Sequence, residues 1–97
     1  MPIQVMIKRK WEVDKPEELL PLLSEIRAHA KDQPGYISSE TLRSLDEPEY
    51  FLVISRWETA DYWKKWFSSK KRRDIQSKVD SMIGEKTFYE VFETMSH

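Results

Sequence analysis

The first residues of the chain alternate between apolar and other side chains with the period of a β-strand. Ile3, Val5 and Ile7 begin this alternation, which continues to Val13 and is interrupted by Arg9. A period of two places successive apolar residues on the same face of a strand. We therefore expect the first strand of a sheet in this segment.

A helical period follows. Asp14, with Glu17 three residues later, is an acidic variant of the capping box, and Pro16 suits the first turn of a helix. Five apolar residues then recur at helical spacing: Leu19, Leu22, Leu23, Ile26 and Ala30. This stripe predicts an amphipathic helix. Because Pro21 lacks an N–H group and crowds the preceding turn, we expect a late helix start or a kink.

The next two segments predict a hairpin. Residues 33–35 read Gln-Pro-Gly, which is a strong stop signal for a helix, and residues 36–42 follow as a second strand. Residues 46–49 form a polar turn before residues 50–57, which are almost continuously apolar or aromatic. Such a composition indicates a third strand with both faces covered.

The last third of the chain predicts a broken helix and a final strand. Thr59 can cap a helix, and its aromatic residues share one face: Tyr62, Trp63, Trp66 and Phe67. Ser68 and Ser69 are expected to break it, with Ser69 capping a continuation over residues 70–82. Gly84 ends that segment, and residues 87–92 predict the last strand.

This order of elements predicts an α+β, ferredoxin-like β-α-β-β-α-β fold. Right-handed crossovers place both helices on one face of a four-stranded antiparallel sheet. The other face then needs a cover, since exposed aromatic surface costs about 25 cal/mol per Å². Several aromatic residues are candidates for that face: Tyr50 or Phe51, Trp57, Trp11, and Phe88 or Phe92. A second copy, related by a two-fold axis, would cover them in a homodimer with a closed, barrel-like interior.

Length and composition narrow the classes of protein further. A chain of 97 residues is expected to form a single domain. No apolar run approaches the roughly 18 residues that span a bilayer. The segment from Met1 to Met6 does not have the pattern of a signal peptide, so a cytoplasmic location is expected.

Charge and cysteine content bear on the partners. The chain has no Cys, which removes disulfides and thiolate metal sites. A formal charge of −1 lacks the basic surplus of a nucleic-acid-binding protein, so small molecules or proteins remain as partners. Four residues each of Trp, Tyr and Phe are many for this length, and they either fill a core or line a ligand cavity.

Several motifs together carry a family resemblance. They are Pro34-Gly35-Tyr36, the segment 50–58 that runs from Tyr-Phe-Leu-Val to Arg-Trp-Glu, and then Tyr62 and Trp66. The pattern spans roughly residues 3–93 and resembles the antibiotic biosynthesis monooxygenase (ABM) family of the dimeric α+β barrel superfamily. The resemblance implies one ABM-like domain over residues 1–97, a homodimer, and a pocket between helices and sheet. It also implies no metal, flavin or other cofactor in the quinol and polyketide branch.

In that branch, the resemblance implies cofactor-independent oxygenation of a small electron-rich aromatic compound. The protein supplies a dry cavity, a proton acceptor and hydrogen bonds to the substrate anion. The catalytic candidates are His29 and Tyr36. The substrate-binding candidates are Arg9, Arg56, Trp57, Trp63, Trp66, Phe67 and Gln76.

Each candidate also has a structural interpretation. The aromatic residues can simply form the core between helix and sheet, and His29 can be a partly exposed helix residue. Arg9 is either an anion-binding group inside the barrel or a strand end in solvent. Arg56 can form a cross-strand salt bridge. The basic run 70–73 is expected to be a solvated helix face rather than a phosphate or nucleic-acid site.

Two other functions remain open. The barrel can be a non-catalytic ligand-binding or dimerisation module, in which case Trp side chains should fill the volume that an enzyme keeps open. The haem-degrading branch also carries a Trp at the position of Trp66. It requires a His ligand near Ile75 and Gln76 and an Asn near Lys8 and Arg9, and this chain has neither.

Overall fold

The observed order of elements is the expected one. The structure, a computed structural model, describes residues 2–10, 16–83 and 87–95. Within these residues the elements are β1 (Ile3–Lys10), α1 (Pro16–Lys31), β2 (Tyr36–Arg43), β3 (Tyr50–Trp57), α2 (Ala60–Phe67), α3 (Lys70–Ile83) and β4 (Phe88–Glu93). The ferredoxin-like α+β fold is thereby confirmed.

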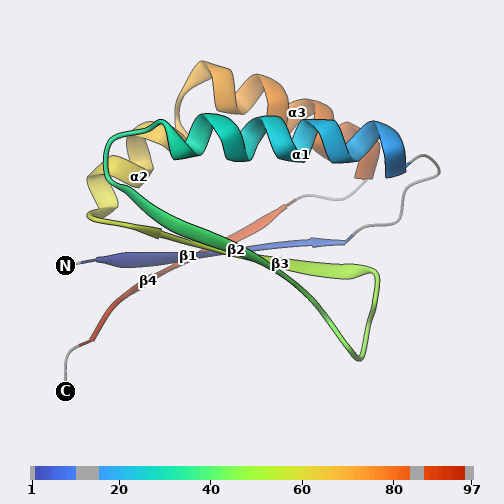
Figure 1. Cartoon of the computed structure of the whole chain (residues 1–97), viewed down its shortest axis with the longest axis horizontal. Helices are drawn as coiled ribbons and strands as arrows, with labels where there is room; N and C mark the ends of the chain where they lie inside the picture. The colour runs from blue at the N-terminus through green and yellow to red at the C-terminus, as the bar shows by residue number, and fades with distance from the viewer. Residues whose placement is uncertain (1, 11–15, 84–86, 96–97) are drawn as a thin grey trace.

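The four strands form one antiparallel sheet in the order β2-β3-β1-β4. Helices α1 and α3 pack side by side over one face of this sheet, and no described element covers the other face (Figure 1). The central strand β1 pairs with both β3 and β4, so that Ile3 lies between Trp57 and Glu93. The two edges of the sheet are β2 and β4.

The alternation along β1 decides which side chains face the helices. Ile3 and Val5 are buried on that side, and Trp57, the register partner of Ile3, is buried with them at 1% exposure. The suggestion that Trp57 lies on the uncovered face is therefore wrong, because antiparallel partners share a face. Phe51, the partner of Arg9, also faces the helices.

The uncovered face carries the residues that alternate along each strand with those facing the helices. Tyr50 pairs with Lys10, and Phe92 pairs with Gln4, on that side of the sheet. Phe88 and Phe92 are exposed. Of the aromatic residues proposed for this face, Trp11 lies outside the described residues.

Helix α1 begins at Pro16 and continues through Pro21, so the expectation of a late start is wrong. Its stripe reaches the core through Leu19, which packs with Val79 and Ile83 of α3. The chain then turns at Gly35, whose φ of 84° lies in the region that favours glycine. The Gly35 carbonyl accepts a hydrogen bond of 2.8 Å from the Glu58 amide, which joins this turn to the start of α2.

Side-chain caps produce the expected break between α2 and α3. The Thr59 hydroxyl accepts a hydrogen bond of 3.3 Å from the Tyr62 amide at the start of α2. Ser68 is the C-cap of that helix, and the Ser69 hydroxyl accepts a bond of 3.3 Å from the Arg72 amide. These bonds satisfy backbone groups that the helix ends would leave unpaired. Within the described part of the chain, none of the helices is long and apolar enough to cross a membrane.

Candidate functional site

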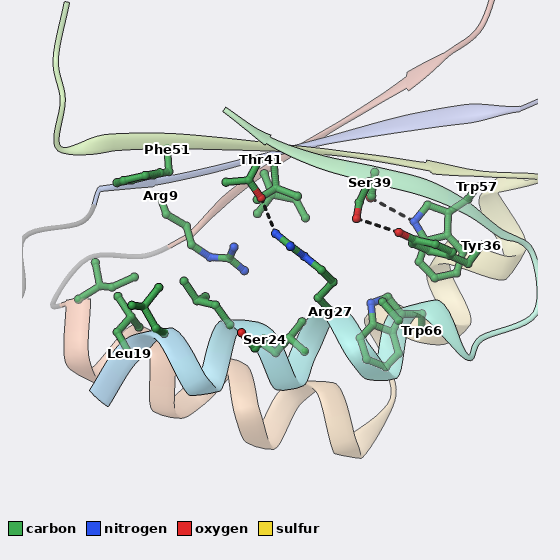
Figure 2. A pocket seen from close by; sticks show the side chains of 18 residues that line it. Arg9, Leu19, Ser24, Arg27, Tyr36, Ser39, Thr41, Phe51, Trp57 and Trp66 are labelled. Carbon is green, nitrogen blue, oxygen red and sulfur yellow. Dashed lines mark hydrogen bonds between the residues drawn. The ribbon is translucent and has the colours of Figure 1, made fainter. Parts of the chain in front are cut away.

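A cavity of about 240 Å³ lies between α1 and the helix-facing side of the sheet. Figure 2 shows side chains from both layers directed into it. Most of its wall is apolar or aromatic, and includes Ile7, Leu23, Ile26, Val53, Trp57 and Trp66. A volume somewhat below the about 300 Å³ of the smaller drug-binding pockets suits a small ligand.

Two of the tryptophans predicted to bind substrate form one end of this cavity. Trp57 is almost fully buried and donates a hydrogen bond of 3.1 Å from Nε1 to the Ser55 hydroxyl, while Trp66 is 6% exposed. Tyr36 lies edge-on to Trp57, with 5.5 Å between ring centroids. The Tyr36 hydroxyl is 2.8 Å from that of Ser39, and both residues line the cavity. Of the two predicted catalytic residues, Tyr36 is therefore at the site.

The other two aromatic candidates lie outside the cavity wall. Trp63 packs on Phe67 with 4.9 Å between ring centroids, and Phe67 meets Tyr89 edge-on at 5.0 Å. These contacts join α2 to β4. The structure therefore places Trp63 and Phe67 in helix-to-sheet packing, which was the alternative interpretation of the aromatic face.

Arg9 is directed into the protein rather than into solvent. Its side chain extends from β1 into the space between the sheet and α1 (Figure 2), and its Nη2 donates a hydrogen bond of 3.1 Å to Oε1 of Gln76. Its Nε is buried without a hydrogen-bond partner among the described residues. Burial lowers the pKa of Arg9, while Tyr89 and Asp80 act in the opposite direction. The cavity wall therefore includes a largely desolvated cation.

Gln76 holds the side chain of Arg9 in place and is itself held by a network of hydrogen bonds. Its Nε2 donates hydrogen bonds of 2.9 Å to Oδ1 of Asp80 and 3.0 Å to the Thr87 hydroxyl. Thr87 in turn donates a bond of 3.0 Å to the same Asp80 oxygen. Gln76 is buried but does not line the cavity. The structure brings it together with Arg9, as a holder of that side chain and not as part of the wall.

The basic run at the start of α3 is not entirely a solvated face, and the expectation is corrected at Arg72. This residue is 6% exposed, donates a hydrogen bond of 3.0 Å to the Phe67 carbonyl and another to the Tyr89 hydroxyl. Its guanidinium lies 4.2 Å from the centroid of the Phe67 ring. Burial raises the pKa of Tyr89, and the charges of Arg72 and Arg9 oppose this shift. The other three residues, Lys70, Lys71 and Arg73, are exposed.

The remaining two candidates lie away from the cavity. His29, in the last turn of α1, has a side chain 27% exposed and its Nε2 is 3.8 Å from Oε1 of Glu25. Arg56 lies on the uncovered sheet face, with Nη1 3.4 Å from the Ser38 hydroxyl and Nη2 3.7 Å from Oε1 of Glu40. His29 is therefore a partly exposed helix residue, and Arg56 forms a cross-strand pair, as their structural interpretations predicted.

Sequence reasoning missed one charged residue of the cavity wall. Arg27 of α1 extends into the cavity, and its Nη2 donates a hydrogen bond of 2.6 Å to the Thr41 hydroxyl of β2 (Figure 2). A signal was present, since Arg27 comes four residues after Leu23 and directly after Ile26, at the border of the apolar stripe. Residues at i and i+4 lie on the same side of a helix.

The model of one protein family matches residues 2–78, under the description antibiotic biosynthesis monooxygenase. The chain belongs to this family. The resemblance read from the Pro-Gly-Tyr turn, the hairpin and the Trp residues is thereby confirmed. Proteins of the ABM family typically form dimeric barrels.

Solved structures share the fold of this ABM protein at low sequence identity. A conserved protein from Methanosarcina mazei Go1 has a TM-score of 0.87 and 16% identity, covering 98% of this chain and 94% of its own. SnoaB, a cofactor-independent oxygenase from Streptomyces nogalater, has a TM-score of 0.84 and 14% identity, covering 99% and 95%. Identities this low establish the fold and not the reaction.

A curated relative of the ABM domain shares more sequence over a shorter stretch. The 42.8 kDa protein in the whiE locus of Streptomyces coelicolor is 31% identical over 58 residues, which are 60% of this chain. The match covers only 15% of that protein. Among the residues described for this ABM domain, no group of three or more His, Cys, Asp or Glu could hold a metal ion.

Proposed function

We propose that the protein is a cofactor-independent monooxygenase that acts on a small electron-rich aromatic compound in the cavity between α1 and the sheet. One observation carries the proposal: an open, largely apolar cavity that is lined both by the aromatic side chains of Trp57 and Trp66 and by the partly buried cation of Arg9. A purely structural module should have filled this volume with the side chains of Trp57 and Trp66. These residues form walls instead, which favours a ligand site.

The chemistry needs a substrate anion and dioxygen. A phenolic compound loses a proton, the resulting anion gives one electron to O2, and the two radicals combine into a C–O bond. When a ring CH2 group becomes C=O in this way, one oxygen atom enters the product and the other leaves as water with both hydrogens. All four electrons come from the substrate, so the balance requires no external reductant.

Arg9 is proposed to stabilise the substrate anion. A cation in apolar surroundings interacts with a bound phenolate more strongly than it would in water. It therefore lowers the pKa of the bound phenol and favours loss of the proton. Gln76 is a positioning residue in this scheme, because its hydrogen bond holds the guanidinium of Arg9 at the cavity.

The hydroxyl groups of Tyr36 and Ser39 are proposed to form hydrogen bonds to the substrate oxygen and to relay its proton to water, each hydroxyl giving up its own hydrogen as it receives another. They are hydrogen-bonded to each other at the cavity wall beside Trp57. His29 has no comparable placement, since it lies outside the wall beside Glu25. The proposal therefore assigns the proton-transfer position to Tyr36 and no role in the reaction to His29.

A homodimer is the proposed assembly. The uncovered face of the sheet carries apolar side chains in adjacent strands, among them Met6, Leu42, Leu52, Ile54 and Phe92. Their burial against a second copy would stabilise the assembly by the hydrophobic effect. Dimeric barrels are typical of the family, which supports a second copy as the partner.

Oxygen consumption tests the proposed activity. Purified protein is incubated aerobically with a panel that includes anthrone and naphthalene-1,4-diol, and oxygen uptake is recorded with an electrode. We expect uptake above the rate without protein, with one atom of 18O2 in the product and no accumulation of hydrogen peroxide. Uptake equal to the protein-free rate across the whole panel would contradict the proposal.

Variants connect any activity to the cavity. Arg9→Gln keeps a donor for Gln76 but removes the charge, and should lower kcat about 100-fold if Arg9 stabilises the developing anion. Trp66→Ala should also lower activity, because it opens the apolar wall. Arg73→Gln removes an exposed charge elsewhere and should leave the rate unchanged. Melting temperatures of all three variants separate loss of activity from loss of fold.

A further inference from the structure

Two guanidinium groups enter the cavity from opposite layers of the fold. Arg9 comes from β1 in the sheet, and Arg27 comes from α1, which faces it across the cavity (Figure 2). Arg27 crosses to β2, where it donates its hydrogen bond to Thr41. The two residues differ in exposure, because Arg9 is partly buried and Arg27 is exposed. Arg27 is therefore the charge nearer to solvent.

The charged side chains described in the cavity wall are all positive. Among the described residues that line it, Arg9 and Arg27 are the charged ones, and none is Asp or Glu. Asp80 acts on Arg9 from outside the wall, where its carboxylate is occupied by Gln76 and Thr87. The charge of Arg72 offsets that of Asp80 in the same region. Among the residues that the structure describes, positive charge is therefore in excess at the cavity.

Both arginines keep hydrogen-bond donors for a ligand. A guanidinium has five N–H donors, and the bond to Thr41 uses one of those of Arg27. The bond to Gln76 likewise uses one donor of Arg9, whose side chain lines the cavity. An arginine near an anionic oxygen forms short, charge-assisted hydrogen bonds, and a carboxylate can accept two of them in parallel.

We propose that the substrate is an aromatic carboxylic acid that also carries a phenolic group, with its carboxylate bound by Arg27 and its reacting oxygen bound by Arg9. The buried charge faces the group that ionises during the reaction, where apolar surroundings strengthen the interaction. Arg27, which is exposed, would bind the carboxylate, a group that is already ionised before the substrate binds. At this position the carboxylate can remain partly hydrated. This inference rests on the proposed function, because it takes the same cavity to be the substrate site.

Binding of a matched pair of unreactive probes tests the carboxylate site. Naphthalene-1-carboxylate and its neutral amide, naphthalene-1-carboxamide, have nearly the same shape, and neither is an oxygenase substrate. Isothermal titration calorimetry under argon should give about tenfold tighter binding of the carboxylate. The preference should weaken as salt is raised, because Arg27 is exposed.

Three variants test whether Arg27 causes the preference for the carboxylate probe. Arg27→Gln keeps a donor for Thr41 and should bind both probes equally, while Arg27→Lys should keep most of the preference. Arg73→Gln, an exposed charge on α3, should behave as the unaltered protein. Equal affinity for the two probes in the unaltered protein, no binding of either, or a preference that survives Arg27→Gln would overturn the inference.

The outcome is separable from that of the oxygenase proposal. If the carboxylate is preferred but 1,4-dihydroxynaphthalene-2-carboxylate causes no oxygen uptake above the protein-free rate, the anion site stands and the oxygenase reaction fails. If neutral diols are oxygenated and the probes show no preference, the reaction stands and the carboxylate site fails. Where both hold, Arg27→Gln should raise KM for the carboxylated diol and not for naphthalene-1,4-diol.

Discussion

The Arg9 guanidinium donates a hydrogen bond of 3.1 Å to the side-chain oxygen of Gln76, a residue 67 positions later in the chain. The bond joins the central strand of the sheet to α3 and places a cation beside the cavity. Gln76 can hold it because Asp80 and Thr87 accept its two amide hydrogens. The orientation of the charge therefore depends on side chains from β1, α3 and the residue before β4.

Replacement of Gln76 tests this support. Gln76→Leu leaves the Arg9 Nη2 and the Asp80 carboxylate without their amide partner in a buried region, so we expect the free energy of unfolding to fall by about 1–3 kcal/mol. Urea denaturation followed by circular dichroism measures the change. Lys78→Leu, an exposed residue on the same helix, is the matched control. A loss equal to that of the control would show that the network contributes nothing to stability.

Tyr89 predicts a decrease of stability at alkaline pH. Burial raises its pKa above the ordinary value of 10.0, so the native state keeps the phenol protonated where the unfolded chain ionises. This contribution to stability is fully present below pH 10 and is lost as the pH rises through the folded pKa. Above pH 10, unfolding free energy should therefore fall more steeply in the unaltered protein than in Tyr89→Phe. Parallel pH profiles would contradict this assignment.

Replacement of Gly35 by a larger residue is expected to strain the turn before β2. A Cβ atom there would lie 2.4 Å from the Tyr62 ring, and the φ of 84° disfavours other residues. Gly35→Ala should lower the unfolding free energy by about 1–3 kcal/mol. The double variant Gly35→Ala/Tyr62→Ala separates the two causes, because it removes the collision and keeps the backbone strain. Additive losses in the double-mutant cycle would mean that the collision is absent.

The uncovered sheet face predicts a variant that breaks the proposed dimer. Ile54 lies in β3 between Met6 and Glu40, on the side away from the helices. Ile54→Glu would bury a second carboxylate there without a partner, so the protein should elute as a monomer by size exclusion with light scattering. Lys78→Glu changes charge on the exposed side of α3 and should remain dimeric. A monomeric unaltered protein at micromolar concentration would refute the dimer.

The order of elements and their main boundaries were predictable from local signals. The Pro-Gly turn, the Thr59 cap and the Ser68–Ser69 break depend on hydrogen bonds within a few residues, which the sequence displays directly. Trp66, predicted from the sequence to bind substrate, lines the cavity, and its role in binding stays a prediction. The family resemblance was recognisable from the same segments.

The partners of the charged residues required the tertiary structure. Arg9, Arg72 and Gln76 were visible as polar groups, but the basic run containing Arg72 gave no sign that one of its four residues turns inward to Tyr89. His29 and Arg56 were candidates by residue type alone, and only the packing shows that they lie outside the cavity. Periodicity reports which face of its own element a residue occupies. It does not report which distant side chain meets it there.

The sequence by itself therefore determined the strands, the helices and the need to cover one face of the sheet, because each follows from spacing along the chain. The family was recognised from the resemblance of its motifs. The tertiary structure decided that Arg9 and Arg27 share one cavity and that Gln76 of α3 holds Arg9 through a hydrogen bond. The physical reason is that these contacts join residues from different layers. Their distances depend on how helices α1 and α3 pack on the sheet, and no local pattern of residues specifies that packing.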